Sequence, residues 1–88
     1  MTGAPPTDPL LEQRCWLSED DCIELRLARA TRGLAYRLAF LRDGECLLRY
    51  EHGPGQPHAR TLRGRTTAYA FRSVEQLRYD FERDVEAL

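Results

Sequence analysis

The sequence predicts an α+β fold, in which an antiparallel sheet of four to five strands carries one C-terminal helix packed across one face. Two observations favour this fold. Residues 22–30 and 34–41 alternate apolar and polar side chains, which is the period of a half-buried strand. Residues 73–88 repeat apolar side chains every three or four positions, which is the period of an amphipathic helix. Such a helix needs an apolar surface to cover, and the sheet provides it.

The length and composition limit the chain to one small domain. A chain of 88 residues buries only roughly 60% of its unfolded surface. Its 42% hydrophobic and 31% charged residues are typical of a globular protein. No apolar run approaches the roughly 20 residues that span a bilayer, and the N-terminus lacks the pattern of a signal peptide. We therefore expect a flexible lead-in over residues 1–9, a single domain over residues 10–88, no membrane association and a cytoplasmic location.

The first predicted hairpin joins residues 10–17 to residues 22–30 through an acidic turn. In its second strand Ile23, Leu25 and Leu27 alternate with polar or small residues. The next strand, over residues 34–41, places alternate apolar side chains on one face. These side chains are those of Tyr36, Leu38 and Phe40.

The turn at residues 42–44 permits two registers, because Asp-Gly suits either a two-residue loop or a three-residue loop. A two-residue loop would pair Leu38 with Arg49 and mix charge into the apolar face. A three-residue loop gives one apolar face, so we predict that loop. It pairs Phe40 with Cys46, Leu38 with Leu48 and Tyr36 with Tyr50, and it makes Arg37 and Arg49 neighbouring like charges.

The second half of the chain begins with a loop and ends with the clearest element. Residues 51–57 have the glycine and proline content of a loop, while residues 58–65 and 67–71 suit extended segments with a bend at Gly64. Ser73 followed by Gln76 has the spacing of a helix capping box. The buried core that we expect consists of Leu25, Leu27, Tyr36, Leu38, Phe40, Leu48, Leu77, Phe81 and Val85.

Charge is segregated along the chain. All 13 basic residues are arginine, and residues 26–72 hold ten arginines against three acids, whereas both flanking segments are acidic. A basic middle suits either a groove for a polyanion or strands whose charges pair with a helix packed across them. The three cysteines are odd in number and form no CxxC pair, so we expect buried free thiols. We expect no metal and no cofactor.

The segments "YRLAFLRDGECLLRYEH", "PHAR" and "AYAFRSVEQLRYDFERDVEAL" together resemble the TumE family of small toxins from bacterial and archaeal toxin-antitoxin modules. The likeness covers residues 34–88, and it is carried by the order and spacing of these segments. It implies a cytoplasmic toxin that a cognate antitoxin protein holds in check. Family members often have Asp-Asn where this chain has Glu51 and His52, and His-x-His where it has His58 and Arg60.

The chemistry open to the loop around residues 50–66 is metal-independent cleavage of RNA. His58 titrates near neutrality and can serve as a general base or acid. Arg60 shares a face with His58 in an extended segment and would stabilise the charge on phosphorus. Glu51 or His52, across the loop, would supply the complementary acid or base.

Four further arginines are candidates for binding phosphate groups: Arg37, Arg49, Arg63 and Arg65. Each of these roles has a non-functional alternative. A histidine in such a loop is commonly a solvated surface residue, and edge-strand arginines commonly prevent aggregation. We assign the aromatic side chains Tyr36, Tyr50, Tyr69 and Phe71 to the core rather than to base stacking.

The alternative function is a non-catalytic module that binds a protein through an exposed strand and an arginine-bearing face. A cognate antitoxin is the partner we expect for a toxin. RNA and a second copy of the chain are left open as further partners.

Overall fold

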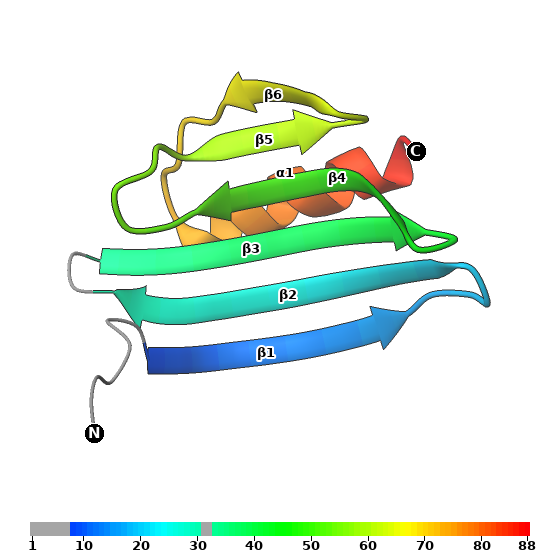
Figure 1. Ribbon diagram of the computed structural model, residues 1–88, viewed down its shortest axis with the longest axis horizontal. Coiled ribbons are helices and arrows are strands. Elements are labelled where there is room, and N and C mark those ends of the chain that lie inside the picture. The colour runs from blue at the N-terminus through cyan, green and yellow to red at the C-terminus, as the bar shows by residue number, and fades with distance from the viewer. Residues whose placement is uncertain (1–7, 31–32) are drawn as a thin grey trace.

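The computed structural model describes residues 8–30 and 33–88. In it the chain forms a six-stranded antiparallel sheet followed by one helix (Figure 1). The strands lie in the sheet in the order in which they occur in the chain, so each strand pairs with its neighbours in sequence. The elements are β1 Asp8–Trp16, β2 Asp21–Ala30, β3 Gly33–Arg42, β4 Glu45–His52, β5 Ala59–Leu62, β6 Arg65–Ala68 and α1 Val74–Glu86.

The α+β class is confirmed, but the sheet has six strands rather than four to five. The difference arises where the sequence predicted one extended segment over residues 58–65. Arg63 and Gly64 both have positive φ, 49° and 84°, and they form a two-residue turn with Leu62 opposite Arg65. That turn divides the segment into β5 and the start of β6. Strand β6 ends at Ala68, so most of the extended segment predicted over residues 67–71 lies outside any strand.

The predicted N-terminal boundaries shift by two residues. Residues 1–7 of the expected lead-in lie outside the described residues, whereas residues 8 and 9 already belong to β1. Strand β1 pairs with β2 in an antiparallel hairpin, as predicted. In the acidic turn between them, the hydroxyl oxygen of Ser18 accepts hydrogen bonds from the backbone N–H groups of Asp20 and Asp21.

The predicted three-residue loop between β3 and β4 is wrong. Asp43 and Gly44 have φ values of 54° and 78° and form a two-residue turn with Arg42 opposite Glu45. These angles are those of a type I′ turn, whose twist matches that of the strands it joins. The predicted loop is wrong because β4 contains a β-bulge, which the alternation of side chains does not reveal. Leu47 has no partner across the strand pair, and the register shifts by one residue at this point.

The bulge at Leu47 restores a single apolar face to the sheet. Beyond it Phe40 lies opposite Leu48, Leu38 opposite Tyr50 and Tyr36 opposite His52. The predicted face is therefore correct, although the predicted pairs are not. Arg37 lies opposite Glu51, and Arg49 lies opposite Ala39, so these two arginines are not the facing like charges that the sequence predicted.

Helix α1 begins with the predicted cap. The side chain of Ser73 accepts a hydrogen bond of 3.1 Å from the backbone N–H of Gln76. The side chain of Gln76 does not complete a reciprocal capping box, because its Nε2 donates to Oδ1 of Asp80 at 2.9 Å. The cap fixes where the helix starts and hence which side chains it turns toward the sheet.

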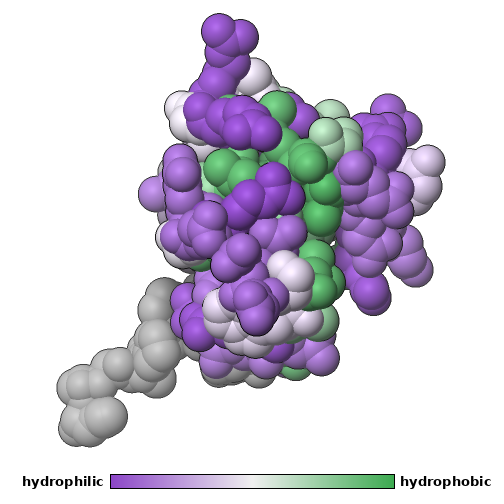
Figure 2. Space-filling model, turned by 90° about the vertical axis from the view of Figure 1, so that its right-hand side faces the viewer, coloured by the Kyte–Doolittle hydropathy of each residue, from purple (hydrophilic) through white to green (hydrophobic). Residues whose placement is uncertain are grey.

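The core lies between α1 and the middle of the sheet. Figure 1 shows α1 behind β3 and β4, and Figure 2 shows hydrophobic side chains as a seam beside the hydrophilic outer side of the helix. Of the predicted core, Leu25, Leu27 and Val85 lie at the margin and are only partly buried. The buried residues of the cluster are Tyr36, Leu38, Phe40, Leu47, Leu48, Tyr50, Leu77 and Phe81.

The three cysteines differ in exposure. Cys22 is buried and Cys46 is partly buried, whereas Cys15 on the edge strand β1 is exposed. The prediction of buried thiols is therefore wrong for Cys15, because β1 lies beyond the part of the sheet that α1 covers. The one helix of the described residues is too short and too polar to cross a membrane.

The sheet face away from α1, here called the open face, carries charged side chains in rows. Arg26 and Arg37 face each other in the middle of one row, with Glu12 and Glu51 at its two ends. Arg26 donates to Glu12 at 2.9 Å. Both side chains of this pair are exposed, so the pair contributes little, about 0 to 1 kcal/mol.

Replacing Phe81 by alanine should lower the free energy of unfolding by about 3 to 5 kcal/mol, because the side chain is only 2% exposed within the core. Urea denaturation followed by circular dichroism measures this change. Tyr79→Ala is the matched control, since Tyr79 lies on the same helix and is 60% exposed. Equal midpoints for the Phe81→Ala protein and the wild type would contradict the packing described here.

Candidate functional site

The two histidines of the chain meet on the helix side of the sheet, at the end of β4. Their rings stack with centroids 3.7 Å apart and an interplanar angle of 10°. Nδ1 of His58 lies 2.8 Å from the hydroxyl oxygen of Tyr36. Phe71 stacks on His58 from another segment, with centroids 4.9 Å apart and an interplanar angle of 11°. Tyr36, His52, His58 and Phe71 are here called the histidine cluster.

The strand register brings these residues together. The bulge at Leu47 places His52 directly opposite Tyr36. The loop after His52 then reverses the chain, with a turn closed by the hydrogen bond from the N–H of Gln56 to the carbonyl of Gly53. His58 immediately precedes β5, and its carbonyl accepts a hydrogen bond of 3.1 Å from the N–H of Tyr69. That bond holds the segment leading to Phe71 beside the histidines.

The surroundings favour the neutral forms of His58 and Tyr36. Burial lowers the pKa of His58, and the neighbouring His52 lowers that pKa further, because two stacked imidazolium ions would repel each other. Burial raises the pKa of Tyr36 to about 12, so its hydroxyl keeps its proton. Among the described residues, Nδ1 of His52 is buried and has no hydrogen-bond partner.

This arrangement suits one proton transfer by His58. When Nδ1–H of His58 donates to the Tyr36 oxygen, Nε2 carries the lone pair that a general base needs. The hydroxyl of Tyr36 and the stacked ring of Phe71 also fix the orientation of the imidazole. Rings stacked at 3.7 Å leave no space for a phosphate between them. His52 therefore tunes His58 from one side rather than facing it across a substrate.

Arg60 lies on the same face of its strand as His58, as the alternation predicted, but its charge is already balanced. Its Nε donates to Oδ2 of Asp84 in α1 at 2.7 Å, and the hydroxyl of Tyr50 donates to the same oxygen at 2.5 Å. The hydrogen bond to Asp84 raises the pKa of Arg60. The three groups join β4 and β5 to the helix, which is a structural role.

The remaining candidates are divided between other parts of the surface. Glu51 lies on the open face, where it accepts a hydrogen bond of 2.8 Å from Nε of Arg49, so it is not beside His58. Arg37 lies on the same face, with Nη1 3.5 Å from Oε1 of Glu24. Arg63 and Arg65 lie at the β5–β6 turn, and both are exposed. The structure thus brings together His52 and His58, and it places Arg60 two residues further along the same face.

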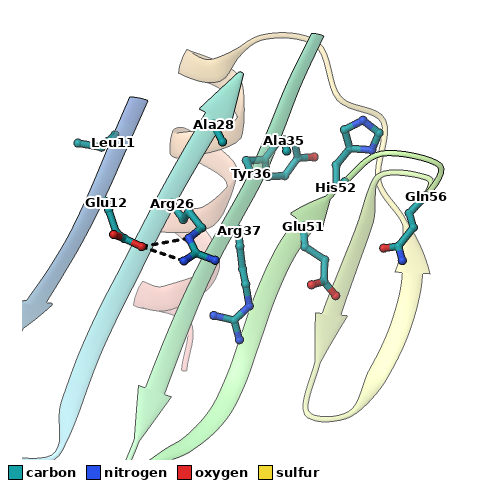
Figure 3. Close-up of a pocket in the computed structure, with 11 residues that line it drawn as sticks. Leu11, Glu12, Arg26, Ala28, Ala35, Tyr36, Arg37, Glu51, His52 and Gln56 are labelled. Carbon is teal, nitrogen blue, oxygen red and sulfur yellow. Dashed lines mark hydrogen bonds and ion pairs between the residues drawn. The ribbon is translucent and has the colours of Figure 1, made fainter. Parts of the chain in front are cut away.

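A hollow on the open face lies close to the histidine cluster (Figure 3). Its floor includes Ala28 and Ala35, which face each other across β2 and β3 and are too small to fill the space. Arg26, Arg37 and Glu51 project around it from neighbouring strands. The hollow therefore offers donors and an acceptor over a shallow apolar floor.

Sequence reasoning missed two members of the histidine cluster and the acceptor for Arg60. Tyr36 and Phe71 were assigned to the core, where both indeed pack, and their contacts with His58 depend on a register that the bulge determines. The sequence gives only a weak indication of Asp84 as that acceptor: it is an acidic residue on the same side of the helix as the apolar Leu77 and Phe81. In residues 8–30 and 33–88, no three His, Cys, Asp or Glu side chains lie close enough together to hold a metal ion.

Comparison of the chain with known protein families, with curated proteins and with solved structures finds no match.

The lowered pKa of His58 predicts a pH-dependent stability. The unfolded chain binds a proton at His58 near its ordinary pKa of about 6.5, before the folded protein does. The contribution of this residue is therefore fully present above about pH 6.5 and is lost as the pH falls toward the lower folded pKa. Melting temperatures between about pH 7.5 and 5 should fall more steeply for the wild type than for His58→Asn.

The asparagine variant is the matched comparison, because its side-chain amide can either donate a hydrogen bond to the Tyr36 hydroxyl or accept one from it, but cannot titrate. Carboxylates titrate in both proteins, so the difference between the two curves isolates His58. A difference that stays constant across this pH range would show that His58 has the same pKa folded and unfolded.

Proposed function

We propose that this chain is the toxin of a toxin-antitoxin module and acts on RNA in the cytoplasm, as a small ribonuclease or as an RNA-binding inhibitor of translation. The observation that carries this proposal is the histidine cluster. In it a neutral imidazole with a lowered pKa is held by a protonated tyrosine hydroxyl between two stacked rings. Proton transfer to or from such a group is the step that metal-independent cleavage of RNA needs.

The resemblance to TumE toxins supports the same function. Tyr36, His58 and Phe71 come from the three separate segments that carry the likeness, and their side chains meet at one place. The aromatic residue that precedes Phe71 in the likeness, Tyr69, donates its hydroxyl to Asp80 of the helix at 2.6 Å. The segments are therefore joined by contacts between the residues that define the likeness.

The proposed reaction assigns one role to each group. Nε2 of His58 accepts the proton of a 2′-hydroxyl, the resulting oxygen attacks the adjacent phosphorus, and the 5′-oxygen leaves and takes a proton from water. Tyr36 holds the imidazole through Nδ1, while burial first, and His52 second, keep the pKa of His58 low. Arg63 and Arg65, which are exposed at the β5–β6 turn, would bind flanking phosphates.

Production of the wild-type chain in a bacterial host should inhibit growth, and His58→Ala should abolish that inhibition. A general base supplies about 10² to 10⁴ in rate, which a growth assay resolves. Cleavage of total RNA is the direct readout. The variants must be compared at matched expression and melting temperature, with Tyr79→Ala as a control on an exposed position of the helix.

Two further variants sharpen this test. His52→Ala should reduce inhibition less than His58→Ala, because His52 acts only through its neighbour. Full inhibition by a folded His58→Ala protein would remove the catalytic role and leave RNA binding. A wild-type chain that never inhibits growth would contradict the toxin function itself.

RNA binding should depend on the arginines of the β5–β6 turn. For single strands each phosphate contact contributes about 0.7 to the slope of log affinity against log salt concentration. Arg63→Ala with Arg65→Ala should therefore weaken binding and reduce that slope by about 1.4. Arg78→Ala with Arg83→Ala is the matched control, since it removes the same charge from exposed positions of α1. An equal loss in both double variants would show that the effect is one of net charge.

A specific observation favours the non-catalytic interaction module as the second candidate. Three of the assigned arginines are engaged within the chain: Arg37 with Glu24, Arg49 with Glu51 and Arg60 with Asp84. Cations that are already paired attract a polyanion weakly. Affinity for a protein partner that is insensitive to salt, together with no measurable RNA binding, would favour this second function.

A further inference from the structure

Strand β1 is an edge of the sheet, and nothing among the described residues pairs with its outer side. An edge strand presents a row of backbone N–H and C=O groups that a further strand can bind. The other edge, β6, has only four residues, Arg65–Ala68, whereas β1 has nine. The longer edge is the better candidate for pairing.

Apolar side chains gather at this edge. Leu10, Leu11, Trp16 and Leu17 are 51%, 36%, 62% and 52% exposed, and in the described part of the chain Tyr79 is the one other exposed large hydrophobic residue. Helix α1 packs over the middle of the sheet and leaves this margin uncovered. Apolar residues that border unpaired backbone groups are typical of an interaction surface.

We propose that β1 pairs with β1 of a second copy of this chain. The two strands run antiparallel about a two-fold axis at Gln13, so that the two sheets join into one. Pairs across the interface then consist of residues whose numbers are symmetric about 13, and both helices lie on the same side of the joined sheet. A two-fold interface of this kind uses the same residues of each subunit.

Charge selects this register. With the axis at Gln13, Glu12 lies opposite the partner's Arg14, and the same pair forms a second time by symmetry. A shift of two residues in either direction would instead place Glu12 opposite the partner's Glu12, or Arg14 opposite the partner's Arg14. Facing like charges on neighbouring strands are destabilising, so these two registers are disfavoured.

A shift of one residue is disfavoured for a different reason. It would oppose Leu11, whose side chain lies on the helix side of the sheet, to the partner's Arg14, whose side chain lies on the open face. Directly opposed residues of antiparallel strands must point to the same face, so this pairing cannot form. In the proposed register Leu11 lies opposite the partner's Cys15. The partner's Trp16 lies beside Leu10, the unpaired residue at which β1 shifts register against β2. Each exposed apolar side chain of the strand therefore gains an apolar neighbour.

The charged rows of the open face also continue across the joint. Within one chain Glu12 binds Arg26 and Arg14 binds Glu24. Glu12, Arg14 and Arg26 remain 62 to 66% exposed in these ion pairs, so each has room for a second partner. The row across the interface then alternates in sign from Arg26 through Glu12 and the partner's Arg14 to the partner's Glu24. Charged side chains on an edge strand commonly prevent pairing, but these are complementary to their own symmetry mates.

Charge reversal tests the proposed interface. Sedimentation analysis of the wild-type chain over a range of concentrations should show a monomer-dimer equilibrium. Glu12→Arg places arginines at both positions 12 and 14, and Arg14→Glu places glutamates at both. Each variant alone should self-associate at least about tenfold more weakly than the wild type.

Mixing the two variants supplies the decisive control. An equimolar mixture of Glu12→Arg and Arg14→Glu should form a heterodimer, because opposite charges then face each other at both positions. The loss of the ion pairs within each chain cannot produce this rescue. A wild type that stays monomeric at every concentration, or variants that dimerise as strongly alone as when mixed, would overturn the proposal.

A cross-link distinguishes this interface from self-association through another surface. Directly opposed residues of antiparallel strands have Cα atoms about 4.5 to 5.5 Å apart, within the range for a disulfide. Gln13→Cys in a Cys15→Ser background should therefore form a covalent dimer on mild oxidation. Cys15 of the wild type should not link to its own symmetry mate, since the two lie four residues out of register. A dimer without the Gln13→Cys cross-link would contradict the proposed register.

Discussion

The burial of Leu77 and Phe81 against β3 and β4 is the interaction on which the rest of the structure depends. The sheet has a single apolar face, and the helix has a single apolar stripe, so neither is stable in water alone. Their contact also fixes polar groups at its margin. Asp84 can receive the hydroxyl of Tyr50 and the guanidinium of Arg60 only because Phe81, one turn earlier, anchors the helix over β4.

The sequence allowed the fold class and the helix to be predicted, because both depend on periodicity. Ser73 and the stripe from Val74 to Val85 place α1 to within two residues. The register of β3 and β4 was not predictable in the same way. Alternation shows which side chains share a face, and that part was correct, but a bulge adds a residue without leaving a periodic signal. Leu47 is flanked by Cys46 and Leu48, and all three are apolar. Its residue type therefore does not distinguish it as the unpaired residue of the bulge.

In the candidate site too, features that follow from strand alternation could be predicted, whereas contacts between segments distant in the sequence could not. The common face of His58 and Arg60 follows from strand alternation, and the separation of Glu51 from His52 follows from the same rule. The stacking of His52 on His58 depends on a loop of five residues that returns the chain to one point, and loop geometry is not encoded in a period. The pairing of Arg60 with Asp84 joins residues 24 positions apart, which only the packed helix brings together.

The uninterrupted order of the strands has a consequence for how the chain is made. Because each strand pairs with the one before it, the sheet can extend strand by strand as the ribosome delivers residues 8 to 68. The helix that covers it is synthesised after all six strands. A growing chain therefore passes through a stage at which all six strands have been synthesised, but the helix that would cover their apolar side chains has not. During that interval the nascent protein is a target for chaperones, and for any ligand that recognises the face later hidden by α1.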